Sequence, residues 1–105
     1  MSIAIREKDS NLVLAEGEAG EKAIKYEGSW YFDPSVVDKS VLVVTDRTYT
    51  CPVKGTCNWV DFVDPSGRKV KDVAWVYPKT KAGHESIAGK YGFYAGSRGG
   101  TRQEG

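Results

Sequence analysis

Glycine and proline divide this chain into short segments, and that spacing limits the folds it can adopt. Twelve glycines and four prolines are spread over 105 residues. The segments between them are rich in β-branched and aromatic residues, which favour strands. Strands are therefore predicted over residues 12–16, 23–26, 29–32, 41–45, 47–50, 58–63, 70–77 and 91–94. Many short strands at regular spacing are typical of a β-sandwich or a barrel.

One short helix interrupts this pattern. Residues 82–88 predict about two helical turns, and Gly89 stands where a left-handed glycine commonly ends a helix. The length of the chain favours a single domain, which we place at residues 1–95. Residues 96–105 are rich in glycine and contain no predicted core residue, so we expect them to form a flexible tail.

Charge and hydropathy exclude some classes of protein. The chain has 15 basic and 14 acidic residues and a net charge of +1. A dedicated nucleic-acid-binding protein usually has a clear basic excess, so we do not expect a nucleic-acid partner. The first residues have too short an apolar run for a secretory signal, and no segment reaches the roughly 18 to 20 apolar residues of a membrane span. We therefore expect a cytoplasmic protein with no membrane partner and with reduced cysteines.

One hairpin can be predicted in detail. Residues 64–67 read Asp-Pro-Ser-Gly, which is typical of a type I turn followed by a left-handed glycine in a three-residue loop. This loop fixes the register of the two strands beside it. The predicted cross-strand pairs are Asp64 with Arg68, Phe62 with Val70, Asp61 with Lys71, Val60 with Asp72, Trp59 with Val73, Asn58 with Ala74, and Cys57 with Trp75.

The same register gives the hairpin two different faces, because neighbouring side chains on a strand point to opposite sides. The aliphatic face carries Val60, Phe62, Val70, Ala74 and Val76. The aromatic face carries Cys57, Trp59, Trp75 and Tyr77. We expect the aliphatic face to pack in the core. The aromatic face is either a second core layer or the wall of a pocket.

The stretch Cys51-Pro52-Val53-Lys54-Gly55 leads into this hairpin. Cys51 and Cys57 lie too far apart in sequence for a zinc knuckle, and the chain has a single histidine, His84, so we expect neither a metal site nor a cofactor. Cys57 is predicted to be a buried thiol. Cys51 has Lys54 close enough to lower its pKa, and His84 is its one possible catalytic partner.

Lys54 and Gly55 are the best candidates for a binding role in this stretch. Glycine permits a backbone turn that other residues resist. A lysine beside such a turn, at the edge of an aromatic face, is well placed to meet an anionic group on a ligand. The alternative is an ordinary solvated lysine.

Five motifs follow one another along the chain. They are Val13-Leu14-Ala15-Glu16, Trp30-Tyr31-Phe32 with Pro34, Cys51-Pro52-Val53-Lys54-Gly55, Val73-Ala74-Trp75-Val76-Tyr77-Pro78, and Ile87 with Gly89 followed by Gly92-Phe93-Tyr94. In this order they resemble the bacterial family catalogued as domain of unknown function 427. The resemblance covers residues 13–94 and leaves out the last residues of the chain.

The resemblance implies a fold. The family is similar to the β-tent proteins, in which two antiparallel sheets lean together and enclose an aromatic-lined pocket. Related tents, such as the ligand-binding domain of cereblon, hold a zinc ion with two pairs of cysteines. This chain has no such pairs and resembles a zinc-free tent. Its residues at the recurrent positions of the family are Tyr31, Cys51, Lys54, Gly55, Trp59, Trp75 and Tyr77.

Two departures from the family pattern concern the same face. Cys57 stands where the family usually has a small residue, and Asn58-Trp59 replaces a pair similar to Ser-Tyr. The lining of the pocket is therefore expected to differ from that of relatives.

Three functions remain open at this point. The first is a module that binds a small organic ligand in the aromatic pocket, with Lys54 meeting a polar or anionic group. The second is an enzyme that uses Cys51 as a nucleophile, or Lys54 as a base or Schiff-base amine. The third is a domain that offers its aromatic face to a peptide or a nucleic-acid single strand.

Overall fold

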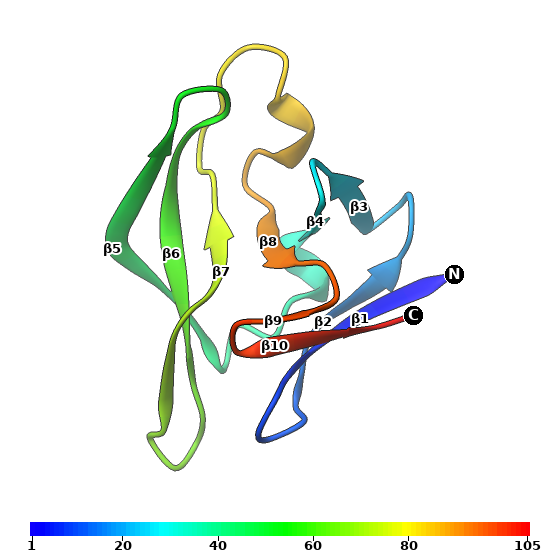
Figure 1. Cartoon of the computed structure of the whole chain (residues 1–105), viewed down its shortest axis with the longest axis vertical. Helices are drawn as coiled ribbons and strands as arrows, with labels where there is room; N and C mark the ends of the chain where they lie inside the picture. Colours follow the sequence, from blue (N-terminus) through cyan, green and yellow to red (C-terminus); the bar gives the residue numbers. More distant parts are fainter.

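The computed structural model describes all residues from 1 to 105 and contains two antiparallel sheets (Figure 1). The smaller sheet has the strand order β2-β1-β10-β9, formed by β1 (Ser2–Glu7), β2 (Val13–Glu18), β9 (Ser97–Arg98) and β10 (Thr101–Glu104). The larger sheet has the order β3-β4-β8-β7-β6-β5, formed by β3 (Ala23–Tyr26), β4 (Ser29–Phe32), β5 (Leu42–Cys51), β6 (Gly55–Val63), β7 (Lys69–Val76) and β8 (Tyr91–Tyr94). The predicted all-β fold with two antiparallel sheets is confirmed.

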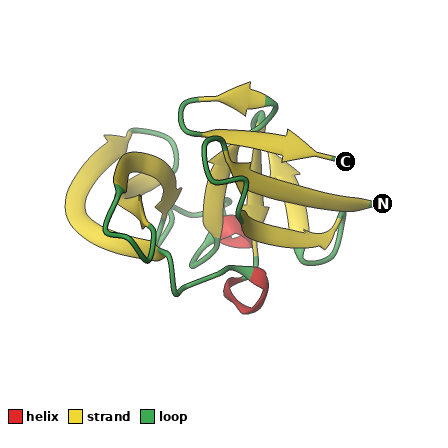
Figure 2. Ribbon diagram, turned by 90° about the horizontal axis from the view of Figure 1, so that it is seen from below, coloured by secondary structure: helices red, strands yellow, loops and turns green.

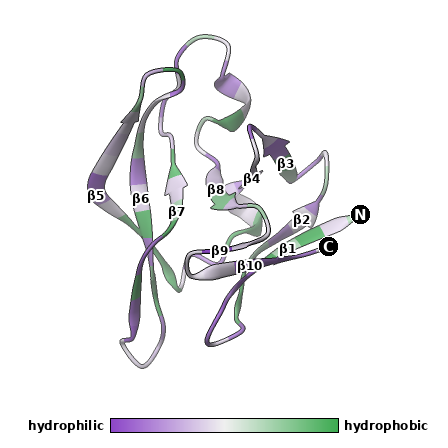
Figure 3. Ribbon diagram, viewed as in Figure 1, coloured by the Kyte–Doolittle hydropathy of each residue, from purple (hydrophilic) through white to green (hydrophobic).

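The main hydrophobic core lies between the two sheets. Ile3 and Ile5 of β1 pack in one cluster with aromatic side chains of the larger sheet, including Phe32, Phe62 and Phe93. The rings of Phe32 and Phe93 meet edge to face, with centroids 5.7 Å apart. Figure 3 shows hydrophobic and hydrophilic residues on the same strands. Because neighbouring side chains on a strand point to opposite faces, each sheet turns one face to this core.

The β6–β7 hairpin confirms the predicted turn. The Asp64 N–H donates to the Arg68 carbonyl at 3.0 Å, and Gly67 has a φ of +91°. Phe62 lies opposite Val70, as predicted. Beyond this pair a bulge shifts the register by two residues. Val60 lies opposite Ala74, Trp59 opposite Trp75, and Asn58 opposite Val76. A shift of two residues preserves the faces of the side chains beyond the bulge, so the predicted division into an aliphatic and an aromatic face is confirmed for these pairs. Val73, predicted opposite Trp59, packs in the main core instead.

A buried carboxylate explains the bulge. Asp61 is buried and accepts a hydrogen bond from the backbone N–H of Asp72 at 3.0 Å. Asp72 takes a φ of +57°, which aspartate tolerates better than most residues. The Arg47 guanidinium pairs with both carboxylates, at 2.7 Å from Asp72. The predicted register past Phe62 is therefore wrong. It was based on turn chemistry alone, which cannot reveal this long-range ion pair.

Strand β5 forms an exposed edge of the larger sheet and joins two of the predicted strands. Its pairing with β6 is irregular between Val44 and Thr48. Side chains replace ladder hydrogen bonds there: the Thr45 hydroxyl donates to the Trp59 carbonyl at 2.8 Å, and the Asn58 amide donates to the Thr45 carbonyl at 3.0 Å. The irregularity is thus stabilised by polar contacts of its own.

The predicted helix over residues 82–88 is only a short turn. The structure has two 3₁₀ turns, η1 (Pro34–Val36) and η2 (Glu85–Ile87), shown in red in Figure 2. Gly83 takes a φ of +91° inside the expected helix, and Ile87 is the one buried side chain of η2. A single buried side chain cannot stabilise a longer helix. Neither turn has the length or the apolar character to cross a membrane.

The last ten residues are part of the fold, and their description as a flexible tail is corrected. Strand β10 pairs with β1, and Thr101 is only 1% exposed. The Trp30 indole N–H donates to the Gln103 side chain at 3.1 Å, which ties β10 to the larger sheet. The folded domain therefore extends past residue 95. Strand β1, at the centre of the smaller sheet, likewise has no counterpart among the predicted strands.

A second buried carboxylate joins the two sheets. Glu7, at the end of β1, is buried and accepts hydrogen bonds from the N–H groups of Asp9 and Ser10 and from the Arg68 guanidinium at 2.5 Å. Burial alone would raise the pKa of Glu7. These hydrogen bonds outweigh burial and lower the pKa to about 2. The carboxylate is therefore charged in the folded protein throughout the neutral range.

This pKa predicts how stability depends on pH. The folded-state pKa of Glu7 lies below its ordinary value of 4.5, so its contribution is present above pH 4.5 and is lost as the pH falls towards 2. We expect Glu7→Gln to lower the free energy of unfolding by roughly 2 to 3 kcal/mol at neutral pH and by much less near pH 2. Urea denaturation of both proteins across this range measures the difference. A difference that stays constant with pH would contradict the assignment.

Candidate functional site

The aromatic face of the larger sheet carries the one pocket of the structure. Its centre is a second cluster of buried residues, which contains Tyr31, Cys57, Trp75, Tyr77 and Ile87. The family resemblance implied a pocket enclosed between two sheets. Here the space between the sheets is filled by the main core, and the pocket lies on the opposite face of the larger sheet. The implied position is therefore corrected.

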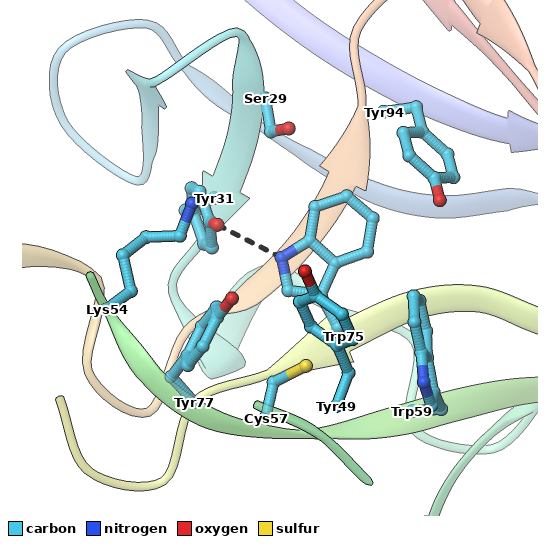
Figure 4. Close-up of a pocket in the computed structure, with 9 residues that line it drawn as sticks. All are labelled: Ser29, Tyr31, Tyr49, Lys54, Cys57, Trp59, Trp75, Tyr77 and Tyr94. Atoms are coloured by element: carbon cyan, nitrogen blue, oxygen red, sulfur yellow. Dashed lines mark hydrogen bonds between the residues drawn. The ribbon is translucent and has the colours of Figure 1, made fainter. Parts of the chain in front are cut away.

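The larger sheet has two halves, and both contribute to the pocket. Figure 1 shows β5, β6 and β7 on one side of the molecule and β3, β4 and β8 on the other. The halves are joined by only two residue pairs, Trp75 with Gly92 and Val76 with Tyr91. The pocket has a volume of about 270 Å³ and lies where the halves meet (Figure 4). Its lining residues are Ser29, Tyr31, Tyr49, Lys54, Cys57, Trp59, Trp75, Tyr77 and Tyr94.

The Trp75 indole is the centre of this aromatic arrangement. Its ring meets those of Tyr31, Trp59 and Tyr94, with centroids 6.2, 6.1 and 4.9 Å apart. All three contacts are edge to face, which is a favoured geometry for aromatic pairs. The indole N–H donates to the Tyr31 hydroxyl at 3.0 Å, as Figure 4 shows. Trp75 is only 7% exposed, so it forms the floor of the pocket more than its open wall.

Gly92 makes this position of the indole possible. A Cβ atom at residue 92 would lie 2.3 Å from Nε1 of Trp75 and 2.8 Å from Cε2 of Tyr31. Both distances are far below van der Waals contact, and both rings are held in the buried cluster. The glycine of the Gly92-Phe93-Tyr94 motif is thus required because the indole packs directly on the β8 backbone.

The stretch from Cys51 to Gly55 is a tight turn that presents Lys54. The Lys54 N–H donates to the Cys51 sulfur at 3.4 Å, and Gly55 takes a φ of +120°. The loop that contains Lys81 also forms hydrogen bonds with this turn. The Lys81 N–H donates to the Lys54 carbonyl at 2.9 Å, and the Lys81 ammonium donates to the Pro52 carbonyl at 2.7 Å. The backbone of Lys54 is therefore fixed on both sides.

The Lys54 side chain extends to the pocket and forms an ion pair. Its side chain is 17% exposed, and its ammonium group lies 2.8 Å from the Glu27 carboxylate. Burial lowers the pKa of Lys54, but the hydrogen bond to Glu27 and the attraction of nearby groups outweigh it, and the net pKa is raised. Lys54 is thus a stable cation at neutral pH.

The pocket has no second charged residue. Burial raises the pKa of Tyr31 and of Tyr77, so both phenols are neutral hydrogen-bonding groups at physiological pH. Burial also raises the pKa of Cys57, whose thiol is therefore protonated. Lys54 provides the only formal charge among the lining residues.

Neither cysteine is hydrogen-bonded to the single histidine. Hydrogen bonds from the N–H groups of Lys54 and Val53 lower the pKa of Cys51, but Cys51 does not line the pocket. His84, its one possible partner, instead hydrogen-bonds through Nδ1 to the Tyr26 hydroxyl. Both cysteines are free thiols. No group of three or more His, Cys, Asp or Glu side chains is arranged to hold a metal ion.

The structure brings together most of the predicted site residues. Tyr31, Lys54, Trp59, Trp75 and Tyr77 line the pocket. Cys51 and Gly55 do not line it and instead shape the turn that carries Lys54. Four lining residues are absent from the predicted site: Ser29, Tyr49, Cys57 and Tyr94, of which Cys57 does lie on the predicted aromatic face. Tyr49 could have been found, because it lies directly opposite Cys57 on the neighbouring strand. Ser29 and Tyr94 reach the pocket only through the pairing of distant strands.

The contact between Gly92 and Trp75 predicts the effect of a single methyl group. We expect Gly92→Ala to destabilise the protein by roughly 1 to 3 kcal/mol, because the new Cβ overpacks a closed aromatic cluster. Trp75→Phe removes the indole atoms that the methyl group would strike. In that background Gly92→Ala should cost clearly less, as measured by urea denaturation. An equal cost in both backgrounds would show that the indole does not impose the glycine.

A protein-family model matches most of the chain. The family model described as Domain of unknown function (DUF427) matches residues 13–104. The match includes β10, which lies beyond the motifs that carried the resemblance. A search of curated proteins finds no match. Because the model covers most of the chain, this protein belongs to the DUF427 family.

Proposed function

We propose that this protein binds a small, flat organic molecule in its aromatic pocket, with Lys54 meeting a polar or anionic group of that molecule. The observation that carries the proposal is the convergence of six aromatic side chains and one cation on a single pocket. Pockets of this kind, mostly apolar with a few placed polar groups, are the usual form of small-molecule sites.

The size of the pocket supports a small ligand. Its volume of about 270 Å³ lies just below the roughly 300 to 1,000 Å³ of most ligand sites. A water molecule takes up roughly 30 Å³ in the liquid, so the pocket has room for a compound of one or two rings. This size favours a single ring system over a run of stacked bases or a peptide segment.

The open side of the pocket offers surfaces for stacking. Tyr49 is 53% exposed, and Trp59 is half-buried beside it. Their rings are tilted by 51° with centroids 6.4 Å apart. An aromatic ligand that stacks on these rings would cover exposed apolar surface, which is favourable in water.

The state of Lys54 favours binding over catalysis. A general base or a Schiff-base amine must lose its proton near neutral pH, and such lysines have lowered pKa values. The pKa of Lys54 is raised, and its ammonium group pairs with Glu27. A charged lysine of this kind is suited to hold an anionic or polar group in place.

Tryptophan fluorescence tests the proposal directly, because Trp59 and Trp75 line the pocket. We expect at least one of benzoate, nicotinate, benzamide and indole to change the emission saturably. Lys54→Gln should weaken the binding of the acids by about tenfold, the usual order for a hydrogen bond to a charged group. Lys79→Gln removes an exposed lysine that does not line the pocket and serves as the matched control. Saturable binding that both variants leave unchanged would contradict the role of Lys54.

A further inference from the structure

The ion pair at the pocket joins two turns that are distant in sequence. Lys54 belongs to the turn before β6, and Glu27 belongs to the turn between β3 and β4. Lys54 lines the pocket, whereas Glu27 does not. The Glu27 side chain is 47% exposed, whereas that of Lys54 is 17% exposed. A ligand inside the pocket would therefore meet an ammonium group that already pairs with Glu27.

The backbone at Glu27 is strained for its residue type. Tyr26 pairs with Ser29, so the hairpin loop consists of Glu27 and Gly28 alone. Both loop residues have positive φ, +50° and +81°, as a type I′ turn requires. Asparagine, aspartate and glycine are preferred in such turns, and a non-glycine residue there is uncommon.

Three non-glycine residues of the chain have a positive φ, and Glu27 is one of them. The other two non-glycine residues with positive φ are Asn11 and Asp72, which tolerate that conformation. Glu27 alone has a side chain that the turn does not favour, and its carboxylate contacts Lys54. Backbone strain of this kind is commonly retained at functional positions. The contact with Lys54 is the one hydrogen bond that the Glu27 carboxylate makes.

Other contacts hold this turn in place without the ion pair. The Tyr26 hydroxyl hydrogen-bonds to His84, and the Tyr26 ring packs edge to face on Tyr31 with centroids 6.2 Å apart. The carboxylate of Glu27 can therefore leave Lys54 while the turn keeps its position. Removing the carboxylate should change the charge at the pocket with little change in its shape.

The charge of the lining residues determines whether the pocket favours an anionic or a cationic ligand. Aromatic pockets can attract cations through their ring faces. Here a cation would meet the ammonium group of Lys54, the only charged group among the lining residues. An anion would pair with Lys54 once Glu27 has been displaced. A neutral ligand has no charge to attract the ammonium group, so it competes with Glu27 much less effectively than an anion.

We propose that Glu27 determines the specificity of the pocket: its carboxylate occupies Lys54 in the free protein, and the ligand is a small aromatic acid whose anionic group takes its place. This inference rests on the proposed function and adds the ligand class to it. In this exchange the exposed carboxylate of Glu27 is replaced by the carboxylate of the ligand. Binding of the ligand also buries its aromatic ring. The ring supplies the free energy that favours the ligand, and competition with Glu27 excludes small anions that have no ring.

The test compares Glu27→Gln with the unchanged protein, using benzoate, neutral benzamide and cationic phenyltrimethylammonium as probes of one ring each. Glutamine keeps the shape of the side chain and removes the competing charge. We expect the variant to bind benzoate about two- to fivefold more tightly, the order expected for an exposed ion pair. Its affinity for benzamide should not change.

Two further variants separate a specific effect from a change in net charge. Glu21→Gln removes one exposed carboxylate that makes no ion pair and should leave the affinity for benzoate unchanged. Combining Glu27→Gln with Lys54→Gln should abolish the gain, because the anion then has no ammonium group to meet.

The binding results distinguish a failure of the proposed function from a failure of the inference about Glu27. If none of the three probes binds the unchanged protein, the proposed function and this inference both fail for ligands of one ring. If benzoate or benzamide binds and Glu27→Gln does not tighten benzoate, only the inference about Glu27 is overturned. Tighter binding of phenyltrimethylammonium than of benzoate would overturn the ligand class. A selective gain for benzoate that disappears without Lys54 supports the proposal.

Discussion

The aromatic site depends on one close contact, in which the Trp75 indole packs on the backbone of Gly92 and donates its N–H to Tyr31. This contact lies at the short junction between the two halves of the larger sheet. It packs a side chain of one half directly on the backbone of the other, beside the pocket. The indole N–H is satisfied by a phenol, so the floor of the pocket has no unpaired donor.

Local sequence patterns predicted the parts of the fold that local chemistry determines. The turn at residues 64–67 and the alternation of β6 and β7 placed Trp59 and Trp75 on one face, and the structure agrees. The prediction remained correct on this point although the register is shifted, because a shift of two residues preserves the faces. The Cys51–Gly55 stretch was also correctly understood as a turn that carries Lys54.

What the sequence could not reveal depends on contacts between distant segments. Strand β10 is polar and has no hydrophobic alternation, so only its pairing with β1 makes it part of a sheet. The bulge at Asp72 depends on Arg47, a residue from another strand. Glu27 is an ordinary exposed glutamate in the sequence, and its importance comes from the position of Lys54. Such features require the assembled fold.

The edge strand β5 shows how a sheet can expose its border to solvent without pairing with another molecule. It is ten residues long and exposes Val43 and Val44, a combination that invites pairing with a strand of another molecule. The irregularity after Val44 breaks the straight row of backbone donors and acceptors on this border. An approaching strand would find only short runs of partners on either side of the break. The polar contacts of Thr45 and Asn58 therefore also protect the protein against aggregation through this border.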